Sequence, residues 1–167
     1  RTNIDLGIDQ QYCQFDSAPD LNSYISDINT QQWTINGEAR DTTSKQTIFT
    51  DIPGVFEYVI YAKEDDAFGG CSNTDTVLIT IKAAPEVNST YTPPSNCGID
   101  DAVLSFFIPS KGSYRYDFEG TNISTFGSID GPDTLFVSGG LSAGVYNYKI
   151  TNLVSSCILE NPVIIED

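Results

Sequence analysis

The stretch Gly54-Val55-Phe56-Glu57-Tyr58-Val59-Ile60 decides the fold, because it returns later as Gly144-Val145-Tyr146-Asn147-Tyr148-Lys149-Ile150. In both copies a cysteine follows, and a second apolar run opens at a valine six residues after that cysteine (Cys71 and Val77; Cys157 and Val163). The offset between copies is 144 − 54 = 90 residues at the glycines and 157 − 71 = 86 at the cysteines. A period that drifts by a few residues indicates one module present twice, with length changes in loops. We therefore expect two domains, 1–84 and 85–167.

Each module consists of short runs rich in Val, Ile, Thr, Tyr and Phe, separated by turn residues, which is typical of β-strands. One position in module one, Trp33, alternates with polar neighbours in the middle of such a run. Short strands, a Trp in a middle strand and a long-range cysteine pair predict an all-β fold of two tandem immunoglobulin-like β-sandwiches. Module two has no Trp, and we expect Tyr116 or Phe118 to fill that place. The only helical pattern lies over 20–28, with apolar residues at helical spacing.

Four cysteines are present, two in each module, and they suggest one cross-link per domain. Cys13 and Cys71 stand 71 − 13 = 58 residues apart, and Cys97 and Cys157 stand 157 − 97 = 60 apart. Near-equal spacing favours the intradomain pairs Cys13–Cys71 and Cys97–Cys157 over the other connectivities. Disulfides are typical of an oxidising compartment, whereas free buried thiols would be the alternative in a reducing cytosol. The absence of histidine and of a CxxC pair argues against zinc.

The charge of the chain limits its partners. The formal net charge is −15 and the pI is about 4.1, so a nucleic acid or an anionic lipid surface would be repelled. No apolar run approaches the roughly 20 residues that span a bilayer, which argues against membrane insertion. The chain has no methionine and opens without a signal-like segment. We expect it to be a fragment of a longer protein.

Three strings carry a resemblance to a known family: Cys13-Gln14-Phe15-Asp16, then Gly54–Val59, then Cys71–Ile81, with Trp33 between the first two. They resemble the tandem Ig-like (PKD-like) repeats in giant surface proteins of gliding Bacteroidetes, including gliding-motility adhesins exported by type IX secretion. Module two is similar over 144–157 but departs from the pattern by lacking the Trp. The resemblance implies a structural or adhesive segment at the bacterial cell surface. Its partners would be neighbouring Ig-like domains of the same chain, surface glycans or other cell-surface proteins.

Calcium is the candidate cofactor, although none is required by the fold. Carboxylates cluster in two loops, and hard oxygen ligands of this kind suit calcium. The alternative is that these are ordinary solvated acidic loops. The candidate ligands are Glu64, Asp65, Asp66, Asp100 and Asp101.

Asp-Ser/Thr pairs, most of them followed by an apolar residue, resemble the O-glycosylation acceptor of Bacteroidetes surface proteins. The alternative is that Asp-Thr is simply frequent in this chain. The candidate acceptors are Ser17, Thr42, Thr76 and Thr134.

Catalysis finds little support, because the commonest general base, histidine, is missing; we expect a non-enzyme. Carbohydrate binding as an accessory module of an extracellular enzyme is the alternative function. Its aromatic platform would lie at Tyr114, Arg115 and Tyr116, although core packing is the alternative role of these tyrosines.

Overall fold

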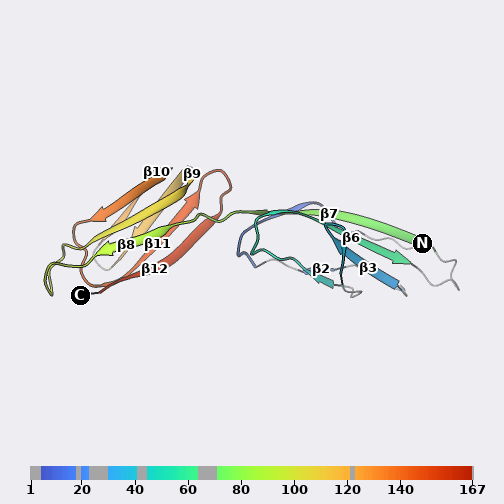
Figure 1. The fold of residues 1–167 in the computed structure, drawn as a ribbon, viewed down its shortest axis with the longest axis horizontal. Helices are drawn as coiled ribbons and strands as arrows, with labels where there is room; N and C mark the ends of the chain where they lie inside the picture. The colour runs from blue at the N-terminus through green and yellow to red at the C-terminus, as the bar shows by residue number, and fades with distance from the viewer. Residues whose placement is uncertain are drawn as a thin grey trace. The chain divides into compact units, whose positions relative to one another are not determined.

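The computed structural model describes residues 5–17, 20–22, 30–40, 45–63, 71–120 and 123–166. Every regular element in these ranges is a β-strand, so the all-β prediction is confirmed. The chain separates into two compact units, Arg1–Ala83 and Ala84–Asp167, a division one residue from the predicted boundary (Figure 1). The helix expected over 20–28 is wrong at its start, since Asp20–Asn22 is a strand. Residues 23–29 lie outside the described ranges.

Unit 1 contains a five-stranded sheet in the order β1-β7-β6-β3-β4. β1 runs parallel to β7, and the other neighbours are antiparallel. A second ladder pairs β2 with β5. The bounds are β1 (Gln10–Cys13), β2 (Asp20–Asn22), β3 (Thr30–Ile35), β4 (Glu38–Ala39), β5 (Lys45–Thr47), β6 (Gly54–Lys63) and β7 (Ser72–Lys82).

The core of unit 1 is built from alternate residues of the sheet, because successive side chains of a strand point to opposite faces. Trp33, on β3 between β6 and β4, is fully buried, as its place in a middle strand predicted. Leu21 of β2 and Ile48, just after β5, add residues from the second ladder to the same buried cluster. The other members are Leu6, Ile35, Tyr58, Ile60, Ala62, Val77, Ile79 and Ile81.

In its described residues unit 2 contains five strands, two of them long and bent. The bounds are β8 (Asn88–Thr92), β9 (Val103–Glu119), β10 (Ser124–Ser138), β11 (Gly144–Asn152) and β12 (Ile158–Ile165). The rings of Phe106 and Phe118 on β9 lie 6.0 Å apart, centroid to centroid. Twelve residues of straight strand would separate them by about 40 Å, so β9 folds back until its halves face each other. β10 follows it, with a register shift between Gly131 and Asp133.

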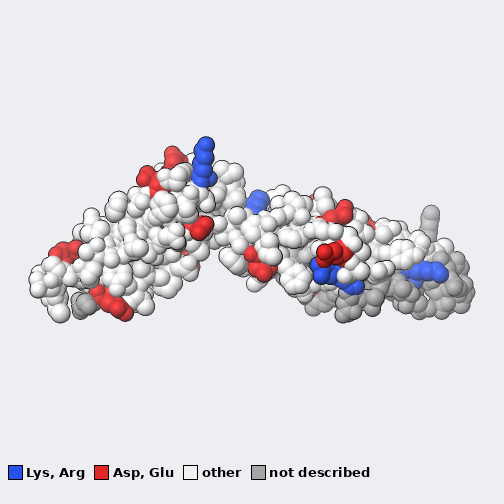
Figure 2. Space-filling view, viewed as in Figure 1, with Lys and Arg blue, Asp and Glu red and all other residues white. Residues whose placement is uncertain are grey.

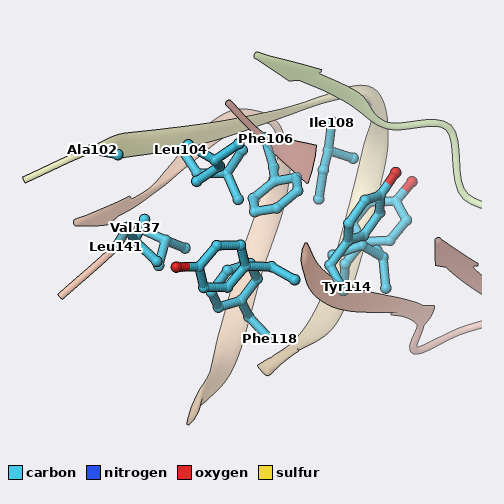
Figure 3. Close-up of a cluster of buried hydrophobic side chains, with 12 residues drawn as sticks. Ala102, Leu104, Phe106, Ile108, Tyr114, Phe118, Val137 and Leu141 are labelled. Carbon is cyan, nitrogen blue, oxygen red and sulfur yellow. The ribbon is translucent and has the colours of Figure 1, made fainter. Parts of the chain in front are cut away.

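The bends divide unit 2 into two layers. The three-stranded layer consists of β8, the first half of β9 and the second half of β10; the four-stranded layer consists of the remaining halves with β11 and β12. Between them lies an aromatic core, in which Phe118 stacks on Tyr146 and Phe106 packs against Tyr148. Figure 3 shows this cluster, with Leu104 and Phe106 facing Phe118 across the core. Phe118 is therefore the buried filler of module two, whereas Tyr116 is half-buried.

The predicted cysteine pairs are wrong. Cys13 and Cys157 are each disulfide-bonded, but Cys71 and Cys97 are free and exposed. In unit 1, Cys13 lies beside Lys82, while Cys71 precedes the other end of the 11-residue β7. Eleven residues of strand span about 36 Å, far beyond the roughly 7 Å Cα separation that a disulfide tolerates.

In unit 2 the reason is the same. Cys97 lies near the start of β11, because it precedes Asp101, which forms a bridge to Leu141 just before that strand. Cys157 lies at the end of β11, because its carbonyl accepts a hydrogen bond from the amide of Asn152, the last residue of the strand. The two cysteines of each module therefore lie at opposite ends of a strand, a relation that sequence spacing does not show.

Candidate binding surfaces

The predicted aromatic platform does not form. Tyr114 is a core residue, 2% exposed, and its hydroxyl donates to the carbonyl of Ser110 at 3.3 Å. Tyr116 points to the same inner side and is half-buried against the core. Arg115 points outward and pairs with Asp117, Nη2 to Oδ1, at 2.8 Å. The three side chains are divided between two faces of β9, because their spacing follows the period of a strand.

The outward side chains of the four-stranded layer form what we call the charged face. In one row across the strands, Asp117 lies opposite Lys149, which lies opposite Glu160. This row and its neighbours line a shallow depression of about 230 Å³. Its lining residues are Asp117, Glu119, Asn147, Tyr148, Lys149 and Glu160. Exposed pairs of this kind contribute about 0–1 kcal/mol each, so the row suits solubility more than stability.

The outward side chains of the three-stranded layer form a second surface, which we call the uncharged face. Phe107 (42% exposed) and Phe136 (67% exposed) lie diagonally on adjacent strands. The hydroxyls of Thr90 and Ser105 lie beside them and bond to each other at 2.7 Å. The full set is Asn88, Thr90, Thr92, Val103, Ser105, Phe107, Thr134, Phe136 and Ser138. Sequence reasoning missed this face, although alternation over 103–107 and 134–138 could have revealed it.

The structure describes two of the five candidate calcium ligands. Glu64, Asp65 and Asp66 lie outside the described residues. Asp100 and Asp101 are exposed, and Asp101 Oδ1 accepts a hydrogen bond from the amide of Ser95 at 2.8 Å. Bonds from the Ser95 hydroxyl and amide lower the pKa of Asp101 below its ordinary value. Within the described ranges no three potential ligands cluster, and Asp101 acts as an acceptor that closes its own turn.

Two tyrosines of unit 1, Tyr58 buried and Tyr12 half-buried, have a raised pKa. Burial raises the pKa of Tyr12 and of Tyr58, and for Tyr58 a hydrogen bond to the Phe49 backbone and the charge of Arg40 act in the opposite direction. Both side chains pack on the core of unit 1. Burial disfavours the charged phenolate form, so the direction of both shifts is in line with a packing role.

The candidate glycosylation residues differ in access. Ser17 and Thr76 are exposed, Thr134 is half-buried on the uncharged face, and Thr42 lies outside the described residues. In Asp75-Thr76 and Asp133-Thr134 the threonine amide donates to the preceding aspartate at 2.8 and 2.7 Å. The aspartates thus have a local structural role within each strand.

No family model matches the chain, and no curated protein matches it either. Among solved structures it is similar to the β-glucuronidase of Parabacteroides merdae, with 9% identity and a TM-score of 0.38. That match covers 98% of this chain but 24% of the enzyme. It is also similar to the fibronectin(III)-like modules of Clostridium thermocellum CbhA, with 10% identity, a TM-score of 0.40, and coverage of 99% and 94%. Similarity at this level carries no functional conclusion.

The part of the chain that the structure describes contains no helix with the length and hydrophobicity of a membrane span.

Proposed function

We propose that the chain is a structural segment of a larger extracellular protein and that it transmits tension between its neighbours. The parent would be a cell-surface adhesion or gliding-motility protein exported by type IX secretion, as the sequence resemblance implies. Tandem immunoglobulin-like sandwiches would then act as spacers. The disulfide-bonded states of Cys13 and Cys157 support an oxidising, extracellular location.

The observation that carries this proposal is the parallel pairing of the first and last strands of unit 1. β1 lies alongside β7 with Gln10 opposite Ile79 and Cys13 opposite Lys82. A pull on the two ends of the unit draws parallel strands in opposite directions along their axes. The hydrogen bonds of the ladder are then sheared together rather than broken one at a time, which resists a larger force.

Side-chain bonds lengthen this ladder beyond β1. The amide of Leu6 donates to Asp75 Oδ2 at 2.5 Å, and the amide of Leu78 donates to Asp9 Oδ1 at 2.9 Å. At the other end the amide of Gln14 donates to the carbonyl of Lys82 at 2.8 Å. Bonds to a carboxylate are stronger than neutral ones, so the segment 6–14 is held along most of β7.

Single-molecule force spectroscopy on the full chain tests the proposal. Handles are attached at residue 1 and at Ala84, and the protein is kept reduced so that no covalent cross-link holds β1. We expect a resolved unfolding peak for unit 1 and a lower peak force in Asp9→Ala and Asp75→Ala. Glu57→Ala, an exposed carboxylate on β6, is the matched control and should leave the force unchanged. Extension without a resolved peak, or an equal effect of Glu57→Ala, would overturn the proposal.

A further inference from the structure

We propose that the uncharged face of unit 2 is a docking surface for an uncharged polysaccharide. This activity goes beyond the structural role, and either could hold without the other.

The absence of charge on this face is its first distinguishing property. None of its outward side chains is ionisable, although the chain carries 23 acidic and 8 basic residues. The opposite face of the same unit has Arg115, Asp117, Glu119, Lys149 and Glu160 in the equivalent outward positions. Figure 2 shows the usual pattern on the side in view, with charged groups scattered over both units. On soluble proteins about 25–35% of surface residues are charged. A face without charged residues has no group that would attract an ionic ligand, so it favours a neutral partner.

The second property is the mixture of flat apolar and hydroxyl groups. Phe107 and Phe136 are diagonal neighbours, with Phe107 opposite Thr134 and Phe136 opposite Ser105. Diagonal Cβ atoms on adjacent strands lie about 7–8 Å apart, so the two rings form one apolar strip. A sugar ring has an apolar C–H face and a rim of hydroxyls. The C–H face can stack on a phenylalanine, while the rim can exchange hydrogen bonds with neighbouring Ser, Thr and Asn side chains.

The third property is that the polar groups are already oriented. Thr90 Oγ1 and Ser105 Oγ bond to each other at 2.7 Å, and Ser105 Oγ also lies 3.3 Å from the carbonyl of Thr90. Groups held in place before binding lose less entropy when a ligand arrives. A second copy of this chain is a weaker occupant, because each copy has a net charge of −15 and the copies would repel.

Affinity electrophoresis of the full chain in native gels tests the proposal. The probes are hydroxyethyl cellulose, glucomannan and mixed-linkage β-glucan, with alginate as the anionic comparison. We expect at least one neutral polysaccharide to retard the protein, with little dependence on salt. Phe136→Ala should weaken retardation at least fivefold, and Phe107→Ala should weaken it as well.

Phe126→Ala is the matched control. Phe126 is 75% exposed on the same strand as Phe136 but belongs to the charged face, so its loss should leave retardation unchanged. Circular dichroism of each variant checks that the fold is intact. The proposal is overturned if no neutral polysaccharide retards the protein, if Phe126→Ala has the same effect as Phe136→Ala, or if sedimentation shows that Phe136 mediates self-association instead. A glycan on Thr134 that blocks the face in secreted protein would overturn it too.

Discussion

The two units share one repeated stretch and fasten it differently. In unit 2 the hydroxyl of Tyr146 accepts a hydrogen bond from the amide of Ser142 at 3.1 Å and donates to its carbonyl at 3.0 Å. A tyrosine near the start of this strand that bonds to the backbone a few residues upstream is a known feature of immunoglobulin-like sandwiches. In unit 1 the corresponding residue is Phe56, which has no hydroxyl and packs against the core.

Unit 1 is fastened instead at its N-terminal strand. There, Asp9 and Asp75 bind backbone amides and β1 adds a parallel edge to β7. In unit 2 the first strand, β8, pairs antiparallel with β9 alone and lies in a different layer from the last strand. The repeated stretch therefore specifies the central strands, while each copy secures its edges with its own polar contacts.

The cysteines provide the most complete contrast between the copies. The first cysteine is bonded and the second free in unit 1, and the order is reversed in unit 2. We expect iodoacetamide to modify Cys71 and Cys97 of the native, unreduced chain completely and to leave Cys13 and Cys157 unmodified. Peptide mass spectrometry reads each site. Full protection of all four would restore the pairing suggested by spacing and remove this contrast between the units.

Removal of the largest buried side chain should destabilise unit 1 and leave the stability of unit 2 unchanged. Trp33→Ala leaves a cavity in the fully buried centre of unit 1 and should lower its free energy of unfolding by about 3–5 kcal/mol. Hydrogen exchange read by mass spectrometry should show faster exchange in β3, β6 and β7, with β9 and β11 unchanged. Equal loss of protection in both units would contradict the description of two separate cores.

Gly120 in unit 2 tests how tightly the side chain of Tyr146 is packed. A Cβ at Gly120 would lie 2.1 Å from Cδ1 of the Tyr146 ring, closer than any real contact. Overpacking of this kind costs about 1–3 kcal/mol, so Gly120→Ala should lower the urea midpoint of unit 2. Gly144→Ala is the control, because its Cβ would meet the same ring at 3.8 Å. A midpoint equal to that of the control would show that the ring moves freely.

These contacts also mark the limit of what the sequence could predict. Alternation and turn residues were enough for the all-β fold, for Trp33 in a middle strand and for a counterpart at Tyr116 or Phe118, of which the structure selects Phe118. The cysteine pairs failed because spacing along the chain carries no information on which end of a strand a residue reaches. The helix over 20–28 failed at its start because pairing with β5 overrides a short apolar period. The Tyr114 platform failed because the strand period separates neighbouring side chains.

The hydroxyl of Tyr146 can be removed with little change of shape. Tyr146→Phe makes unit 2 resemble unit 1 at this position and loses two hydrogen bonds to Ser142. Hydrogen bonds contribute about 0.5–1.5 kcal/mol each, and because the Ser142 amide can turn to water we expect a loss near 1 kcal/mol in urea unfolding. Tyr91→Phe, on the exposed strand β8, should have no effect. An unchanged urea midpoint for Tyr146→Phe would show that the hydrogen bonds between Tyr146 and Ser142 do not distinguish the stability of the two units.

The smallest effect concerns the turn that follows the first cysteine of each unit. In unit 1 the amide of Cys13 donates a hydrogen bond to Asp16 Oδ2 at 2.8 Å. In unit 2 the carboxylate that closes the turn is that of Asp101, which accepts a hydrogen bond from the amide of Ser95. Bonds from Ser95 lower the pKa of Asp101. A carboxyl whose pKa is lowered by folding stabilises the fold above its ordinary value of about 3.9, and this contribution is lost as the pH falls through the lowered pKa. NMR titration should show the Asp101 pKa below that ordinary value and rising towards it in Ser95→Ala. If the pKa of Asp101 is ordinary and does not respond to Ser95→Ala, the turn of unit 2 is not closed by this carboxylate, and the contrast with Asp16 in unit 1 disappears.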